Sequence, residues 1–139
     1  SGPDQGPVAK TVHGTVEIGA EGGRQFDGSY GADSSITIPA NALPSEIFDG
    51  EHDFTIDIVY TADSSATGRQ CLFGKGDPPG RFDFLLDKNG DLSNGSGPSL
   101  GSDWPFDVKV RLTVEVYKQG DSWNYTCFRD DSVITSGTW

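Results

Sequence analysis

Acidic residues are where catalysis would first be sought in this chain, because two carboxyl groups about 5 to 9.5 Å apart can hydrolyse a glycosidic bond. Residues 46–51 (EIFDGE) hold three carboxylates, but their spacing does not place a pair on one strand face, and a loop is predicted there. The strand predicted nearby, FTIDIVY at 54–60, carries Asp57 alone. A glycosidase pair is therefore not predicted.

Histidine chemistry finds no better support. His13 lies in the predicted opening strand and His52 in a predicted turn, and no serine stands in the context of a nucleophile elbow. The two histidines do not form a metal-ligand cluster either. The sequence thus predicts a protein that is not an enzyme, with His52 at the surface.

Residues 87–91 (DKNGD) superficially follow the opening of an EF-hand calcium loop. Leu92 follows where that loop needs glycine, no glutamate closes it, and strands are predicted on both sides. Because Asn89 and Gly90 can both take the positive φ angles of a two-residue turn, we predict a β-hairpin here.

Sugar binding would need an aromatic ring beside planar polar side chains. Two of the candidate rings have a structural alternative: Trp123 shares a strand face with Tyr125 and Cys127, as a core residue would, and Trp104 could anchor the long strand that follows it. The predicted ligand-binding set is Tyr30, Asp77, Arg81, Asp83, Trp104 and Asn124.

Size and charge limit the classes of function. The 139 residues suit one domain, 1–139, with 1–10 as a flexible or tag-derived leader. A formal net charge of −11 repels nucleic-acid phosphates, so no nucleic-acid partner is predicted. No stretch approaches the roughly 18 apolar residues of a membrane-spanning helix, and residues 1–10 lack the basic and apolar regions of a signal peptide.

The two cysteines, Cys71 and Cys127, each lie in a predicted strand. We predict a disulfide between them, which would place the protein outside the cytoplasm. Two buried free thiols in a cytosolic protein are the alternative, whereas the spacing does not support a metal pair.

The elements that would position these residues are strands. Glycine and proline together make up 27 of 139 residues, which argues against a helical bundle. Apolar residues alternate with polar ones, most clearly at 107–117. There the even-numbered residues from Val108 to Val116 would face the core, and the odd-numbered residues from Lys109 to Glu115 would face the solvent. The pattern predicts an all-β, antiparallel β-sandwich or jelly roll. The strands are expected at 12–18, 25–30, 34–38, 53–61, 70–74, 81–87, 107–117, 122–129 and 132–135, with one helical turn near 39–48.

The order of these segments resembles the concanavalin A-like jelly roll of the laminin G-like (LamG) superfamily. The resemblance runs through most of the chain, and each fragment alone is weak. It rests on GTV at 14–16, RQFDGS at 24–29 leading into SITIP at 35–39, FTIDI at 54–58, LFGKG at 72–76, RFDFLL at 81–86 with its Asn-Gly turn, the long strand after Trp104, and 123–131 ending in Asp-Asp. Members usually continue past the segment that resembles 132–139, so we expect this chain either to be a fragment or to have its last strands absent or supplied by another chain.

The resemblance implies a function and a cofactor. LamG-like domains often hold one calcium ion between loops, which makes Asp27, Asp77, Asp130 and Asp131 the predicted metal ligands. The predicted function is a non-catalytic extracellular recognition module, secreted or on a cell or virion surface, that binds a glycan or surface ligand. The alternative is a structural or adhesion module that packs against other chains of an assembly and self-associates through open sheet edges.

Overall fold

The computed structural model describes residues 11–13, 16–18, 24–26, 35–39, 50–75, 82–95 and 97–139. None of these residues is helical, and every strand pair among them is antiparallel. The all-β prediction is therefore confirmed. In this part of the chain, no helix is long and apolar enough to span a membrane. The chain divides into two compact units, Ser1–Ser45 and Glu46–Trp139.

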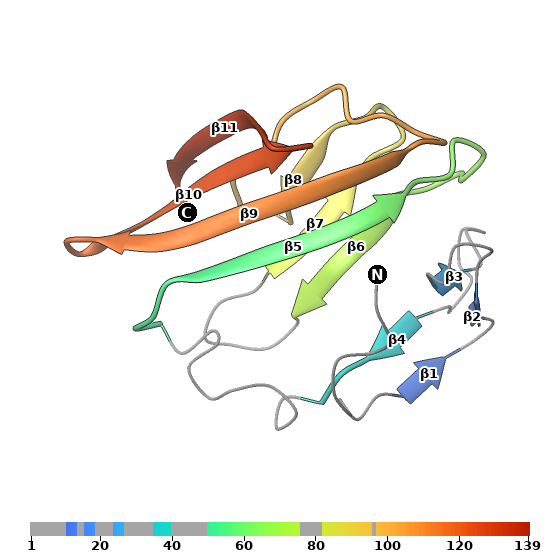
Figure 1. The fold of residues 1–139 in the computed structure, drawn as a ribbon, viewed down its shortest axis with the longest axis horizontal. Coiled ribbons are helices and arrows are strands. Elements are labelled where there is room, and N and C mark those ends of the chain that lie inside the picture. Colours follow the sequence, from blue (N-terminus) through green and yellow to red (C-terminus); the bar gives the residue numbers. More distant parts are fainter. Residues whose placement is uncertain are drawn as a thin grey trace. The chain divides into compact units, whose positions relative to one another are not determined.

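Among its described residues, the first unit has four short strands joined in two pairs (Figure 1). Strand β1 (Thr11–His13) pairs with β4 (Ser35–Thr37), and β2 (Val16–Ile18) pairs with β3 (Arg24–Phe26). The single strand predicted at 12–18 is thus two strands with different partners. Most of the helical turn predicted at 39–48 lies outside the described residues.

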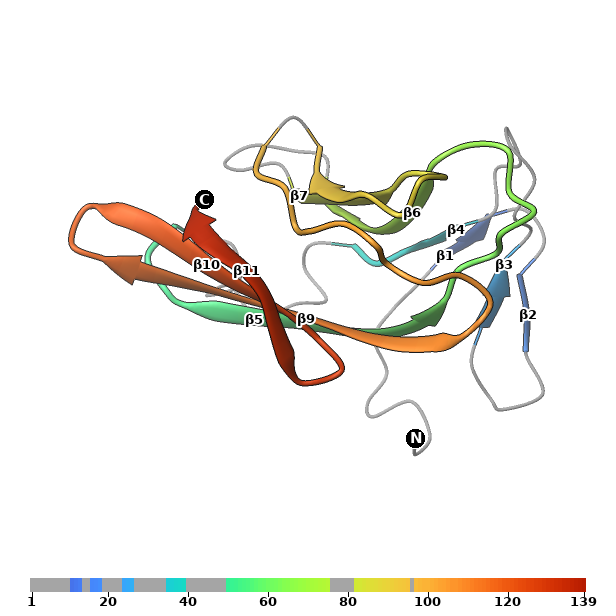
Figure 2. The same cartoon turned by 90° about the horizontal axis from the view of Figure 1, so that it is seen from above.

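The second unit is built from two antiparallel sheets, which Figure 2 shows as two layers. The larger sheet has the strand order β11-β10-β9-β5, and the smaller one has the order β6-β7-β8. The strands are β5 (Phe54–Thr61), β6 (Gln70–Lys75), β7 (Phe82–Leu86), β8 (Leu92–Asn94), β9 (Lys109–Gln119), β10 (Ser122–Arg129) and β11 (Ser132–Thr138).

Period-two alternation determines which face of each strand is buried. In β9, Val110, Leu112, Val114 and Val116 are at most 2% exposed, while the residues between them are half-buried or exposed. Cross-strand pairing brings the inward side chains of β5 into register with them, as at Ile56 opposite Val114. Phe84 and Leu86 of β7 belong to the same core. The two sheets therefore bury one apolar layer between them, as in a β-sandwich.

Short turns join the strands of each hairpin. Asp130 and Asp131 form the two-residue turn between β10 and β11, and both have positive φ angles, 49° and 69°, as a type I′ turn requires. In the turn from β7 to β8, the Asp87 amide donates to the Asp91 carbonyl at 2.9 Å. The predicted hairpin at 87–91 is confirmed.

Candidate functional site

The predicted sugar-binding residues do not form one site in the part of the chain that the structure describes. Tyr30, Asp77 and Arg81 lie outside the described residues. Asp83 alternates with the buried Phe84 and Leu86 of β7, so its side chain faces away from the larger sheet. Asn124 faces outward from the larger sheet, because its neighbour Tyr125 points into the core. The structure thus places Asp83 and Asn124 on opposite outer faces of the sandwich.

Trp104 is a core residue, which corrects its prediction as a sugar platform. The side chain is 1% exposed, and its indole Nε1–H donates a hydrogen bond to the Leu100 carbonyl at 3.1 Å. The Arg129 guanidinium lies 5.4 Å from the ring centroid. A ring enclosed in this way has no free face for a sugar. The burial of Trp104 instead fits the alternative interpretation, in which its ring anchors the chain before the long strand.

The predicted disulfide is also corrected, because Cys71 and Cys127 are free thiols. Cys71 pairs across the small sheet with Leu85, whose neighbours are buried, so the cysteine lies on the outer face. Cys127 is fully buried between the sheets, and its thiol lies 3.6 Å from the Leu100 carbonyl oxygen. Burial raises the pKa of the Cys127 thiol to about 12. Two side chains on different faces cannot be bridged without turning one strand over, so the extracellular prediction loses this support.

The predicted calcium ligands within the described residues have other partners. The Asp130 carboxylate accepts a hydrogen bond from the Arg111 backbone amide at 2.9 Å, and Asp131 lies 3.6 Å from the Arg111 guanidinium. Asp27 and Asp77 lie outside the described residues. Within the described ranges, no three histidine, cysteine or acidic side chains come together as a metal site would require.

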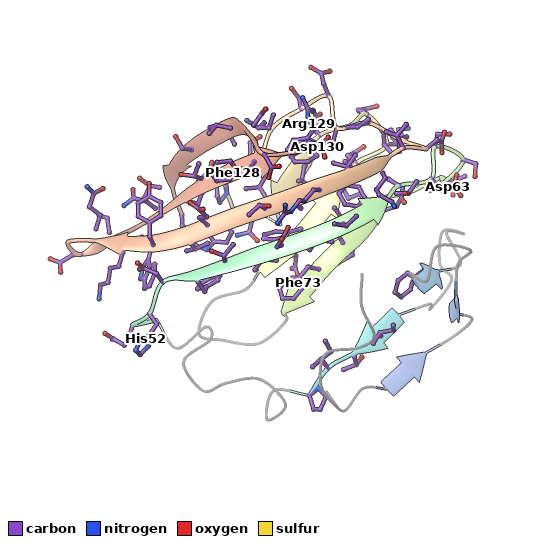
Figure 3. The ribbon with its side chains drawn as sticks, in the orientation of Figure 1. His52, Asp63, Phe73, Phe128, Arg129 and Asp130 are labelled. Carbon is purple, nitrogen blue, oxygen red and sulfur yellow. The ribbon has the colours of Figure 1, made fainter. Side chains whose placement is uncertain are left out.

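Near the β10–β11 turn, charged side chains on the outer face of the larger sheet neutralise one another. Arg111 donates to both carboxylate oxygens of Asp57, with distances of 2.7 to 3.2 Å, and the Thr113 hydroxyl donates to Asp57 at 3.1 Å. These bonds hold the pKa of Asp57 below its usual value, mainly through the Arg111 hydrogen bond. Figure 3 shows Asp130 and Phe128 at this end of β10. We call this set (Asp57, Arg111, Thr113, Asp130, Asp131) the paired end of the sheet.

The opposite end of the same face carries a shallow groove. Its volume is about 470 Å³, and it lies where the start of β5 meets the end of β9. Thr55 pairs directly with Glu115, and Asn124 of β10 lies opposite Tyr117. The lining residues are Asp53, Phe54, Thr55, Glu115, Val116 and Tyr117. We call these residues together with Asn124 the hairpin-end groove.

The polar groups of the hairpin-end groove are only partly engaged. Asp53 accepts a hydrogen bond from the Lys118 backbone amide at 2.8 Å. The Glu115 side chain is exposed and makes no hydrogen bond or ion pair with the described residues. Lys118 itself points to the other face of the sheet, where its ammonium lies 6.0 Å from the Trp123 ring centroid and 3.9 Å from Glu51. The groove therefore offers a half-buried tyrosine ring, an amide, a hydroxyl and two carboxylates.

Of the residues at this groove, the sequence predicted only Asn124 as a binding residue; Tyr117, Glu115 and Asp53 were not predicted. The signal for Tyr117 was present in the alternation of β9. Inward positions are even-numbered from Val110 to Val116, so Tyr117 falls on the solvent side, where an aromatic ring is unusual. Asp53 gave no such signal, because its place beside Lys118 depends on how β5 and β9 pair.

The comparisons with known proteins found no relatives. No family model matches the chain, and no curated protein or solved structure matches it.

Proposed function

We propose that this chain is a non-catalytic recognition module that binds a glycan in the hairpin-end groove. The observation that carries the proposal is the position of Tyr117 on an open sheet face, directly opposite Asn124. Sugar rings pack their C–H faces on aromatic rings, while planar amides and carboxylates hydrogen-bond the hydroxyls that fix orientation. The order of the sequence segments, which resembles that of LamG-like modules, agrees with this proposal.

The arrangement of Asp57 supports a binding role over a catalytic one. Both of its oxygens accept hydrogen bonds from Arg111, and Thr113 adds a third donor. A carboxylate held in this way is a poor proton acceptor or nucleophile, because its charge is already stabilised in the resting state. We therefore assign Asp57 a role in linking β5 to β9 rather than in hydrolysis.

A glycan array followed by calorimetry on the strongest hits tests the proposal. Tyr117→Ala is expected to reduce affinity at least tenfold, with a small change in melting temperature, because the ring is only half-buried. Phe128→Ala is the matched control, since it removes a half-buried ring from the same sheet at the paired end. Binding that survives Tyr117→Ala, or that Phe128→Ala removes equally, would contradict the proposal.

The edge strand β11 favours a second candidate function, a structural module that packs against other chains. Within the described residues, β11 pairs only with β10, and it contains none of the charged residues or prolines that usually protect an edge. Val133 on this strand is 61% exposed. Sedimentation at increasing concentration should then show self-association that Val133→Lys weakens and that Val108→Lys, which alters an exposed valine outside the strands, leaves unchanged. A monomer at all concentrations would exclude self-association.

A further inference from the structure

We infer that the hairpin-end groove selects glycans that carry protonated amino groups over neutral or anionic glycans. The inference rests on the proposed function and specifies its ligand class. It follows from the charges that line the groove and from the positions of the neighbouring cations.

The groove has two carboxylates at its surface and lacks a cation among its lining residues. Glu115 is exposed and makes no hydrogen bond or ion pair with the described residues. Asp53 is exposed as well, and the hydrogen bond that it accepts comes from a backbone amide, so its negative charge has no counter-ion among the described residues. An ammonium group placed between them would supply that counter-ion.

The cations nearest in the strand order are already engaged. Arg111 is held by Asp57 and Asp131 at the paired end. Lys118 lies beside Glu51 and the Trp123 ring, on the face of the sheet opposite the groove. A sulfate, uronate or sialate group would therefore meet two carboxylates and no cation among the groove's lining residues, in a chain whose net charge is −11.

The Tyr117 ring adds to the same preference. A protonated amine near the face of an aromatic ring is attracted by the ring's quadrupole. A neutral sugar would keep the ring contact and its hydroxyls would still donate hydrogen bonds to Asn124 and the carboxylates, but it would lack the attraction between opposite charges. The carboxylates would thus determine the preference for an amine, and the Tyr117 ring would provide affinity for any sugar.

Calorimetry with three oligosaccharides of equal length tests the inference: a glucosamine oligomer with free amines, its N-acetylated counterpart, and a galacturonate oligomer. The expected order of affinity is amine, then N-acetyl, then uronate. The preference for the amine should shrink at 1 M salt, because exposed charges are screened. Glu115→Gln should lower the amine-to-acetyl affinity ratio by about 1.5- to 5-fold, the effect of one exposed charge pair, while its affinity for the N-acetyl oligomer stays the same. Asp121→Asn, an exposed carboxylate in the turn between β9 and β10, is the matched control and should leave the ratio unchanged.

Each outcome bears on one proposal or on both. Binding of the N-acetyl oligomer that equals or exceeds binding of the amine, or a ratio that Glu115→Gln leaves unchanged, would overturn the charge preference and leave glycan binding intact. Tighter binding of the uronate would do the same. Failure of all three oligomers and of the array to bind would overturn the proposed function together with this inference.

Discussion

Alternate residues of β9 lie on two faces with different roles, one buried in the core and the other exposed on the outside of the sheet. On the inner face, Val110, Leu112, Val114 and Val116 are almost fully buried and belong to the core between the two sheets. On the outer face, Arg111 and Thr113 belong to the paired end, while Glu115 and Tyr117 belong to the groove. Burial fixes the inner face, so the outer face can vary without loss of the fold. Substitutions on the inner side should therefore change stability, and those on the outer side should change binding.

The largest expected change in stability tests whether Trp104 is a core ring and Tyr117 a surface ring. Trp104→Ala removes a ring that is 1% exposed, together with its hydrogen bond to Leu100, and should lower the free energy of unfolding by about 3 to 5 kcal/mol. Chemical denaturation measures the loss. Tyr117→Ala, in contrast, should shift the midpoint only slightly. If Trp104→Ala leaves stability unchanged, the ring is not a core anchor.

The two thiols provide the next test, because Cys127 lies in the core and Cys71 lies on the outer face of the small sheet. Cys127 is fully buried and its pKa is raised to about 12, so it should react with iodoacetamide only after unfolding. Cys71 is exposed and should be alkylated in the native protein, slowly, because partial burial and the Asp83 charge raise the pKa of its thiol. Mass spectrometry should find one modification in native buffer and two in denaturant. An intact mass about 2 Da below the reduced value would instead establish the disulfide.

Much of the fold could be predicted from sequence, because alternation over five or more residues has a direct physical cause. The predicted strand at 122–129 has the observed bounds, and the strand predicted at 107–117 differs from β9 by two residues at each end. The strand β8 was predicted only as the second arm of the hairpin at Asn89-Gly90. Alternation with turn chemistry therefore determined the class of fold.

The site was harder to predict, because its residues meet through pairing between distant strands. Trp104 lies in a loop without periodicity, so the sequence could not tell an exposed ring from a buried one. Cys71 was equally ambiguous: both Leu72 and Phe73 follow it, and a bulge between Cys71 and Phe73 interrupts the alternation. Without that register, the faces of the two cysteines could not be compared, and the disulfide prediction was wrong.

The smallest expected effect concerns the ion pair at the paired end of the outer face. Asp57 and Arg111 are 41% and 48% exposed, so solvent screening keeps the coupling between them small. Because the pKa of Asp57 is lowered in the folded protein, its contribution is present above the ordinary value of 3.8 and is lost as the pH falls through the folded pKa.

A double-mutant cycle of Asp57→Asn and Arg111→Gln measures this coupling from unfolding free energies at neutral and acidic pH. The coupling should be favourable at pH 7 and should approach zero below the folded pKa of Asp57, because a protonated carboxyl no longer attracts the guanidinium. A coupling that persists unchanged in acid would show that the charge of Asp57 is not what couples the pair. The contrast between the paired end and the groove would then rest on geometry rather than on charge.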